Sequence, residues 1–397
     1  MENNQEKKLQ KLHRRLCACA VFRGVLKSTL LSLFVKYCKA ESIEEKLNAY
    51  ADFVSQIYEE GGSLTEAVKN LVFTDENVYI KNVARGKTLS KNVLDAAKME
   101  LDILSQFASL TSEDFGYDME IPFEELPKFD SVNAYLGALY EERLQNIHKC
   151  GYGIFSAFGM FRFHDEKGLA PILAADKIGL EDFIGYDEER KKIIDNTKAF
   201  VQGKPAANVL LYGDAGTGKS STVKAVANVF FDEGVRLIEL RKDQLRCLPE
   251  VMAKLYNNPL KFIIFIDDLS FNQNNDDFSM LKATLEGSAS ATAENAVIYA
   301  TSNRRHVVKE KFSDREGDDV HRNDTLQETL SLSERFGLTV FFSKPSKSLY
   351  LKIVQELAKQ KKLDVSEKEL ELKAEEFALR KGNRSARAAR QFINSLL

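Results

Sequence analysis

The chain has few cysteines for its length, and their spacing excludes several classes of protein. Its 397 residues contain Cys17, Cys19, Cys38, Cys150 and Cys247, which form no paired framework. This excludes a disulfide-stabilised secreted scaffold and predicts a reducing, cytoplasmic location. A zinc site is not expected either, because no second ligand pair accompanies Cys17 and Cys19. We expect these two cysteines to be small buried residues.

The chain also lacks a strong net charge and a long apolar run. The formal net charge of −3 gives no overall bias toward nucleic acid or membranes. The most apolar N-terminal window, 16–35, contains Arg23 and Lys27, so we expect neither a transmembrane span nor a signal peptide. The hydrophobic content of 44% is that of an ordinary globular protein, and the length predicts two or three domains.

Residues 1–150 show helical patterns with polar breaks, and they contain no catalytic constellation and no internal repeat. The first forty residues carry nine Lys and Arg against two Glu, with Leu9, Leu12 and Leu16 at helical spacing. Such a basic amphipathic helix could lie on a membrane or on nucleic acid, but the pattern is more typical of a bundle helix with a solvated basic face. We therefore predict a mostly helical N-terminal domain, with 131–148 as one of its helices.

The composition changes beyond residue 150. A Gly- and Phe-rich connector at 151–177 suits a short hairpin or an extended segment. Residues 178–345 then alternate apolar strand-like runs with helical segments, which predicts an α/β domain with a parallel five-stranded sheet. The runs are Val209–Tyr212, Val235–Leu240, Phe262–Ile266, Ala296–Ala300 and Leu338–Phe342.

Residues 346–397 have only helical patterns. Ser366 and Glu369 have the spacing of a capping box, and Gly382 is a typical helix stop. We expect these helices to form a lid on the α/β domain.

A glycine-rich turn follows the first strand-like run. The segment Gly213-Asp-Ala-Gly-Thr-Gly-Lys219-Ser220 fits the pattern G-x-x-x-x-G-K-[ST] and leads into a helical segment. Glycines let backbone N–H groups close around the β-phosphate, and the helix N-terminus adds its positive dipole. Lys219 would reach the β- and γ-phosphates, and the Ser220 hydroxyl would ligate Mg²⁺. The predicted triphosphate-binding residues are Gly213, Asp214, Ala215, Gly216, Thr217, Gly218, Lys219, Ser220 and Ser221.

Two further strand-like runs end in polar residues. Asp267 and Asp268 follow 262–266, and Asn303 follows 296–300. In parallel sheets such residues lie at the carboxyl edge, where ligands bind. Asp267 could hold Mg²⁺ through its water shell, and Asp268 could orient the attacking water. Asn303 could place this water, or it could only cap the following turn.

These motifs together resemble the AAA+ ATPases. The resemblance covers residues 178–397 and is carried by Gly213–Ser220, Phe262–Asp268, Ala300–Asn303, Ser333–Gly337 and Gly382–Arg387. More narrowly, Asp267–Phe271, Tyr299–His306 and Phe312–Gly317 look like those of a bacterial family of predicted P-loop ATPases of unknown function.

The resemblance implies further roles. Asn303 would be the first sensor of the γ-phosphate, Arg335 an arginine finger for a neighbouring subunit, and Arg387 a second sensor on the lid. Ile184 and Gly185 would line the adenine pocket. Two alternatives stay open: Arg335 could pair with Glu334 or another acid, and Arg384 could act in place of Arg387.

The resemblance therefore implies ATP and Mg²⁺ as cofactors, self-association, and an unidentified protein or nucleic-acid client. Asp268 stands where most AAA+ motors have Glu, which predicts slow turnover suited to a switch. The segment 241–248 has no aromatic residue, which argues against a polypeptide-threading machine. An ATP-binding module with little hydrolysis is the main alternative, and phosphotransfer to a small acceptor is the weakest.

Overall fold

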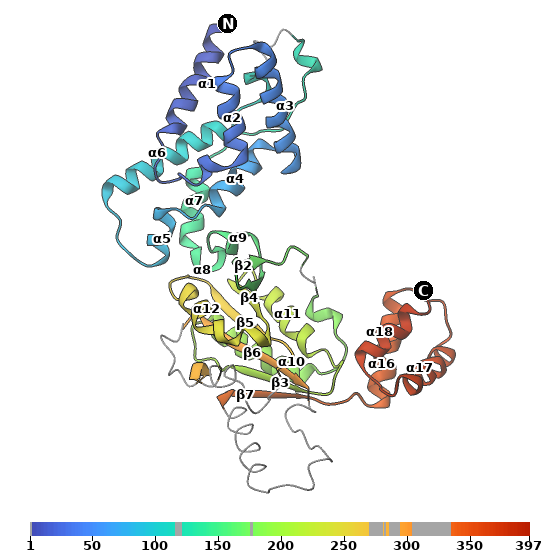
Figure 1. The fold of residues 1–397 in the computed structure, drawn as a ribbon. Helices are drawn as coiled ribbons and strands as arrows, with labels where there is room; N and C mark the ends of the chain where they lie inside the picture. The colour runs from blue at the N-terminus through green and yellow to red at the C-terminus, as the bar shows by residue number, and fades with distance from the viewer. Residues whose placement is uncertain are drawn as a thin grey trace. The chain divides into compact units, whose positions relative to one another are not determined.

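The computed structural model describes residues 2–115, 121–174, 178–269, 281, 283–285, 294–303 and 335–397. The chain divides into two compact units, Met1–Ala157 and Phe158–Leu397 (Figure 1). The first unit contains α1 (Glu2–Cys17), η1 (Val25–Lys27), α2 (Thr29–Lys39), α3 (Ile43–Glu59), α4 (Leu64–Thr74), α5 (Val78–Ala84), α6 (Lys91–Ala108), η2 (Ser112–Asp114), η4 (Phe123–Glu125), α7 (Leu136–Gln145), α8 (Ile147–Cys150) and α9 (Ile154–Ala157). No helix among the described residues is both long and apolar enough to span a bilayer.

The N-terminal unit is a helical bundle around an aromatic core. Leu9, Leu12 and Leu16 of α1 are buried in this core, so the apolar face of α1 packs inside the bundle, as a bundle helix requires. Cys19 is buried but Cys17 is exposed, so the expectation of two buried cysteines was wrong for Cys17. The core is centred on contacting rings of Phe34, Phe53, Phe107, Phe115 and Phe129.

Helix α7 begins five residues later than the sequence predicted. The backbone N–H groups of Val132, Ala134 and Leu136 donate to the hydroxyl oxygens of Thr65, Ser109 and Ser105, at 3.0, 2.9 and 3.0 Å. Thr65 lies in α4, Ser105 lies in α6, and Ser109 directly follows α6. Because the side chains satisfy the backbone donors, the segment 130–135 is held extended before the helix starts.

The described residues of the second unit form six α-helices, the two 3₁₀ helices η5 (Leu180–Asp182) and η6 (Lys242–Cys247), and one mixed sheet. Its strands are β1 (Met160–His164), β2 (Gly168–Pro171), β3 (Val209–Gly213), β4 (Val235–Leu240), β5 (Lys261–Ile266), β6 (Ala296–Asn303) and β7 (Leu338–Phe342). Its helices are α10 (Asp187–Val201), α11 (Lys219–Val229), η6 (Lys242–Cys247), α12 (Leu248–Leu255), α16 (Lys347–Gln360), α17 (Glu367–Lys381) and α18 (Ala386–Asn394), with η6 a 3₁₀ helix.

Among the described residues the sheet has seven strands, in the order β2-β1-β4-β5-β6-β3-β7, so the predicted count of five was wrong. The five expected strands are present and parallel to their neighbours. The two additional strands come from the connector: β1 pairs with β4 in parallel, and β2 pairs with β1 antiparallel. An ion pair between Arg162 and Glu239, 2.8 Å apart, joins β1 to β4.

Strands β3 and β5 are almost entirely apolar, and residues on both of their faces are buried. Alternate residues such as Leu211, Ile263 and Val340 form one core with residues of α10 and α11. The intervening residues, such as Leu210 and Ile264, are also buried. Continuous apolar runs are typical of such two-sided parallel strands.

The last three helices, α16 to α18, have a hydrophobic cluster of their own. Gly382 ends α17 in the left-handed conformation with φ 69°, as the sequence predicted. The predicted capping box is not formed, because the Ser366 side chain makes no cap hydrogen bond.

Candidate nucleotide-binding site

The loop between β3 and α11 has a backbone that requires glycine. Gly213, Gly216 and Gly218 have φ values of 138°, 78° and 94°. A Cβ atom on Gly213 would lie 2.0 Å from the carbonyl oxygen of Phe342, which no side chain tolerates. The loop therefore runs close against β7 and turns sharply into the first residue of α11.

Lys219 is the first residue of α11, and it is only 6% exposed. Its Nζ atom donates to the carbonyl oxygens of Gly213 and Asp214, at 3.3 and 2.7 Å. Burial lowers the pKa of Lys219, and Arg387 lowers it further, while Asp214 and the two acids after β5 oppose this. A partly desolvated cation in a cavity favours binding of an anion, which would compensate its charge.

Asp267 accepts three hydrogen bonds at one oxygen. Its Oδ1 atom is 2.6 Å from Ser220 Oγ, 2.5 Å from Thr301 Oγ1 and 3.1 Å from the backbone nitrogen of Asp268. The hydroxyl of Ser220 and this carboxylate are thus adjacent, as a shared Mg²⁺ would require. No cluster of three or more His, Cys, Asp or Glu suited to a metal occurs among the described residues. A magnesium ion here would therefore need phosphate and water oxygens as further ligands.

Asp268 has a left-handed backbone, with φ 52°. Its N–H group also donates to Thr301 Oγ1, at 2.9 Å, and its Oδ1 atom accepts from Asn303 Nδ2, at 2.7 Å. Non-glycine residues in this conformation are uncommon and persist where the surroundings hold them. Thr301 orients both acids, and sequence analysis missed it because its role depends on the alignment of two strands.

The strand register explains why these side chains meet. Gly213 of β3 is level with Asn303 of β6, and Ile266 of β5 is level with Ala300 of β6. Parallel strands end at one edge of the sheet, so the phosphate-loop glycine, the acids and Asn303 follow one another along it. A cavity of about 340 Å³ lies at this edge, and Gly213 itself does not line it. It is lined by Ala215, Gly216, Gly218, Lys219, Ser220, Ser221, Asp267, Asp268, Thr301, Asn303 and Arg387.

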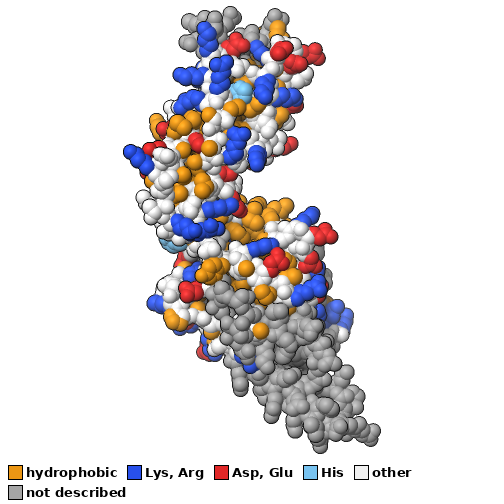
Figure 2. Space-filling view, turned by 60° about the vertical axis from the view of Figure 1, so that its left-hand side comes forward, with side chains coloured by type: hydrophobic (Ala, Val, Ile, Leu, Met, Phe, Trp, Pro, Cys, Tyr) orange, Lys and Arg blue, Asp and Glu red, His pale blue; other side chains and the backbone are white. Residues whose placement is uncertain are grey.

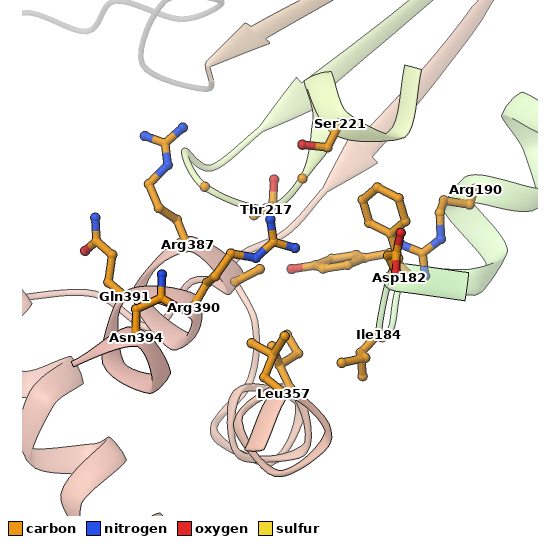
Figure 3. Close-up of a pocket in the computed structure, with 16 residues that line it drawn as sticks. Asp182, Ile184, Arg190, Thr217, Ser221, Leu357, Arg387, Arg390, Gln391 and Asn394 are labelled. Atoms are coloured by element: carbon orange, nitrogen blue, oxygen red, sulfur yellow. The ribbon is translucent and has the colours of Figure 1, made fainter. Parts of the chain in front are cut away.

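A second cavity of about 250 Å³ adjoins the first and shares Gly216, Gly218, Ser221 and Arg387 with it. Figure 3 shows Asp182, Ile184 and Arg190 on one side of it, and Arg387, Arg390, Gln391 and Asn394 on the other. Apolar side chains of Phe183, Ile184, Ile353 and Leu357 contribute to its lining. An apolar cavity with a few polar groups suits a purine ring.

Arg190 supports the wall of this second cavity. Its guanidinium lies over the Phe183 ring, 5.1 Å from the centroid, and donates to the carbonyl oxygen of Gly185. It also pairs with Asp187 at 3.0 Å. Gly185 and Asp214 line neither cavity; they contribute backbone carbonyl groups to Arg190 and Lys219 instead.

The arginines named from the sequence have different environments. Arg387 lines both cavities, and its backbone N–H donates to the carbonyl of Gly216 at 3.3 Å. Arg384 forms two bonds to the Glu375 carboxylate, at 3.1 and 2.8 Å. Arg390 also lines the second cavity, although sequence analysis did not select it.

Arg335 is not part of either cavity. It precedes β7, whose Leu338 pairs with Val209 at the start of β3, and a Cβ on Gly337 would lie 3.0 Å from Ala207. Glu334, its alternative partner, and the motif 312–317 lie outside the described residues.

Comparison with known proteins gives three matches. The model of a family described as "Protein of unknown function (DUF815)" matches residues 156–397. A replication factor C large subunit from Thermofilum pendens is 36% identical over 77 residues, which is 19% of this chain and 18% of that protein. The replication factor C large subunit from Staphylothermus marinus is 34% identical over 68 residues, 17% of this chain and 15% of that protein. The matched segments thus span less than one fifth of either relative.

Proposed function

The chain belongs to the DUF815 family and is an AAA+ ATPase-like protein, and we propose that it binds ATP with Mg²⁺ and hydrolyses it slowly. One observation carries the proposal. Lys219, the Ser220–Asp267 pair and the Asp268–Asn303 pair line one polar cavity, which adjoins an apolar cavity of suitable size for a base. Residues 178–345 would form the ATP-binding domain and 346–397 its lid.

In this proposal each polar group has one role. Lys219 and the loop N–H groups hold the β- and γ-phosphates, and Asn303 contacts the γ-phosphate. Ser220 and Asp267 hold Mg²⁺, which would neutralise charge on the phosphate oxygens. Asp268 orients the water whose oxygen forms a bond to the γ-phosphorus while the bond to the ADP oxygen breaks. The proton of this water passes to Asp268 or to the released phosphate.

Arg387 is the better candidate for the lid sensor. Its place in both cavities lets its guanidinium approach the phosphates, whereas Arg384 is occupied by Glu375. A fixed cationic fork beside the phosphates would couple the presence of ATP to the position of α16–α18. This coupling supports a nucleotide-controlled switch acting on a client that residues 1–150 would hold, with 151–177 as the connector.

Turnover should be slow and dependent on Mg²⁺. The Asp268 carboxylate is one methylene shorter than the Glu of most AAA+ motors, and it already accepts a hydrogen bond from Asn303. We expect phosphate release well below about 10 per second, the median of enzymes in general. A coupled phosphate assay with and without EDTA measures this. A faster rate would exclude the switch, and no release at any Mg²⁺ concentration would favour the alternative of a pure ATP-binding module.

Arg335 is proposed to act on the nucleotide of a neighbouring subunit. Arg335 precedes the first residue of β7, whereas the phosphate loop follows the last residue of β3, which runs parallel to β7. The two therefore lie at opposite ends of these strands. A strand rises about 3.3 Å per residue, so the two ends of these strands are roughly 13 Å or more apart. Arg335 is therefore poorly placed to reach the phosphates of its own chain, and a head-to-tail contact would be needed.

Mixing two inactive variants tests this trans role. Arg335→Ala should lower phosphate release by about 10³-fold because a finger that stabilises transferred charge is lost. Adding an excess of Lys219→Ala protein, which keeps Arg335 but lacks a phosphate-binding lysine, should restore activity. A mixture that stays inactive, or a protein that remains monomeric with and without ATP-Mg²⁺ by light scattering, would contradict the trans finger.

A further inference from the structure

A cationic groove lies on the N-terminal unit, far in sequence from the nucleotide site. It has a volume of about 560 Å³ and lies between α1, α6 and the segment 133–135. Lys8, Lys11 and Arg15 of α1 line one wall, and Ser105, Gln106 and Tyr135 contribute to the other walls. We propose that this groove binds a single-stranded nucleic-acid segment.

The cations of the groove repeat along one helix face. Lys8 and Arg15 are seven residues apart, about 10 Å along the helix at about 1.5 Å per residue, and Lys11 lies between them. Lys8 bonds Asp114 at 2.5 Å and Arg15 bonds Gln106 at 2.6 Å, while Lys11 has no ion pair or side-chain hydrogen bond among the described residues. A row of positive charges of this kind matches a partner with regularly repeated negative charges, such as a phosphate backbone.

The positive region extends around α1 beyond the groove. Lys7 and Arg14 are exposed on the same helix. Figure 2 shows several Lys and Arg side chains over the upper part of the N-terminal unit, with Asp and Glu side chains beside them. The pKa of His13 is lowered, first by burial and then by the charges of Lys39 and Arg14. Residues 41–157 carry more acidic than basic side chains, so this positive region is local to the first helices.

An exposed aromatic side chain completes the groove. Tyr135 is 74% exposed at the groove, and nearby in sequence Val132 is 67% exposed. Tyr135 precedes α7 in the segment that α4 and α6 hold extended, so its backbone is fixed although its ring is free to solvent. Grooves with cations for the backbone and an aromatic ring for base stacking are typical of sites for single strands.

Two other anionic partners fit less well. An amphipathic acidic peptide needs an apolar groove, yet apart from the Tyr135 ring only Leu12 and Ala134 contribute apolar side chains to the lining of this one. Insertion into an anionic membrane would need the apolar face of α1, which is buried in the bundle core. Both partners are included as arms of the test.

The test measures the binding of the full chain to a fluorescent single-stranded 20-nucleotide oligonucleotide by anisotropy, at several salt concentrations, without ATP. Lys11→Glu combined with Arg15→Glu should weaken binding at least about tenfold and reduce the salt slope by about 1 to 2. Tyr135→Ala should weaken binding to the single strand at least about fivefold and leave the salt slope unchanged. The binding of the Tyr135→Ala variant to a duplex of the same length should equal that of the wild type.

Lys87→Glu is the matched control, because Lys87 is exposed on the same unit and does not line the groove. It should bind as the wild type does, and all variants should keep the wild-type melting temperature. If a melting temperature falls, Lys11→Gln replaces the double variant. The proposal is overturned if Lys87→Glu loses as much affinity, if Tyr135→Ala is unchanged, or if a poly-glutamate peptide or phosphatidylserine vesicles bind the groove more tightly than the oligonucleotide.

Discussion

Replacement of Lys219 by Ala is expected to abolish ATP binding. The ammonium is buried beside the loop, and in the bound state it would exchange its two carbonyl acceptors for phosphate oxygens. Loss of charge-assisted bonds to phosphate should weaken affinity by at least about a hundredfold. Wild-type protein at an ATP-Mg²⁺ concentration of 100 times the Kd should gain about 2.7 kcal/mol of stability, and the variant should gain almost none. Thermal melting and titration with a fluorescent ATP analogue measure both effects.

Folding of the Lys219→Ala protein should survive. Burial lowers the pKa of this lysine, so the folded protein disfavours its charged form, and this offsets part of the loss of its two bonds to carbonyl groups. Lys224→Ala is the matched control: Lys224 lies on the same helix, its amine pairs with Glu239 at 2.8 Å, and it lines neither cavity. It should bind ATP normally. Undiminished affinity in Lys219→Ala would refute the assignment of the loop as a phosphate site.

The parts that sequence analysis predicted well are those that local physics determines. The glycine-rich turn after β3 and the emergence of Asp267 and Asp268 after a buried strand follow from short segments. Each of these two features depends only on its own residues and on a neighbouring strand. Gly382 likewise ends α17 because a left-handed residue is needed there, whatever the helix packs against.

The errors arose where distant segments decide the structure. The strand β1 is short, and its pairing with β4 and an ion pair from Arg162 to Glu239 place it in the sheet, which no local pattern reveals. The late start of α7 depends on hydroxyl groups more than 20 residues away. Arg390 and Thr301 lie at the cavities because of how the helices and strands pack. Their neighbours in sequence therefore do not predict their roles.

Asp268→Asn is expected to stop hydrolysis while keeping ATP binding. Asparagine adopts the left-handed backbone as readily as aspartate, and its side-chain oxygen can still accept from Asn303, so the local structure should persist. The substitution removes only the negative charge that orients and deprotonates water. Loss of such a group should lower phosphate release by about 10²- to 10⁴-fold.

The comparison of Asp268→Asn with Lys219→Ala separates chemistry from binding. The two substitutions should give similar losses of phosphate release, but the Asp268 variant should retain wild-type affinity and thermal stabilisation by ATP-Mg²⁺. Equal and nearly zero rates in the wild type and in Asp268→Asn would instead identify an ATP-binding module. In that case the Asn303–Asp268 bond of 2.7 Å would be a resting arrangement that the γ-phosphate does not open. A difference of two orders of magnitude between these proteins would show that the Asp268 carboxylate acts on the water during turnover, since the bond to Asn303 occupies only its Oδ1 atom.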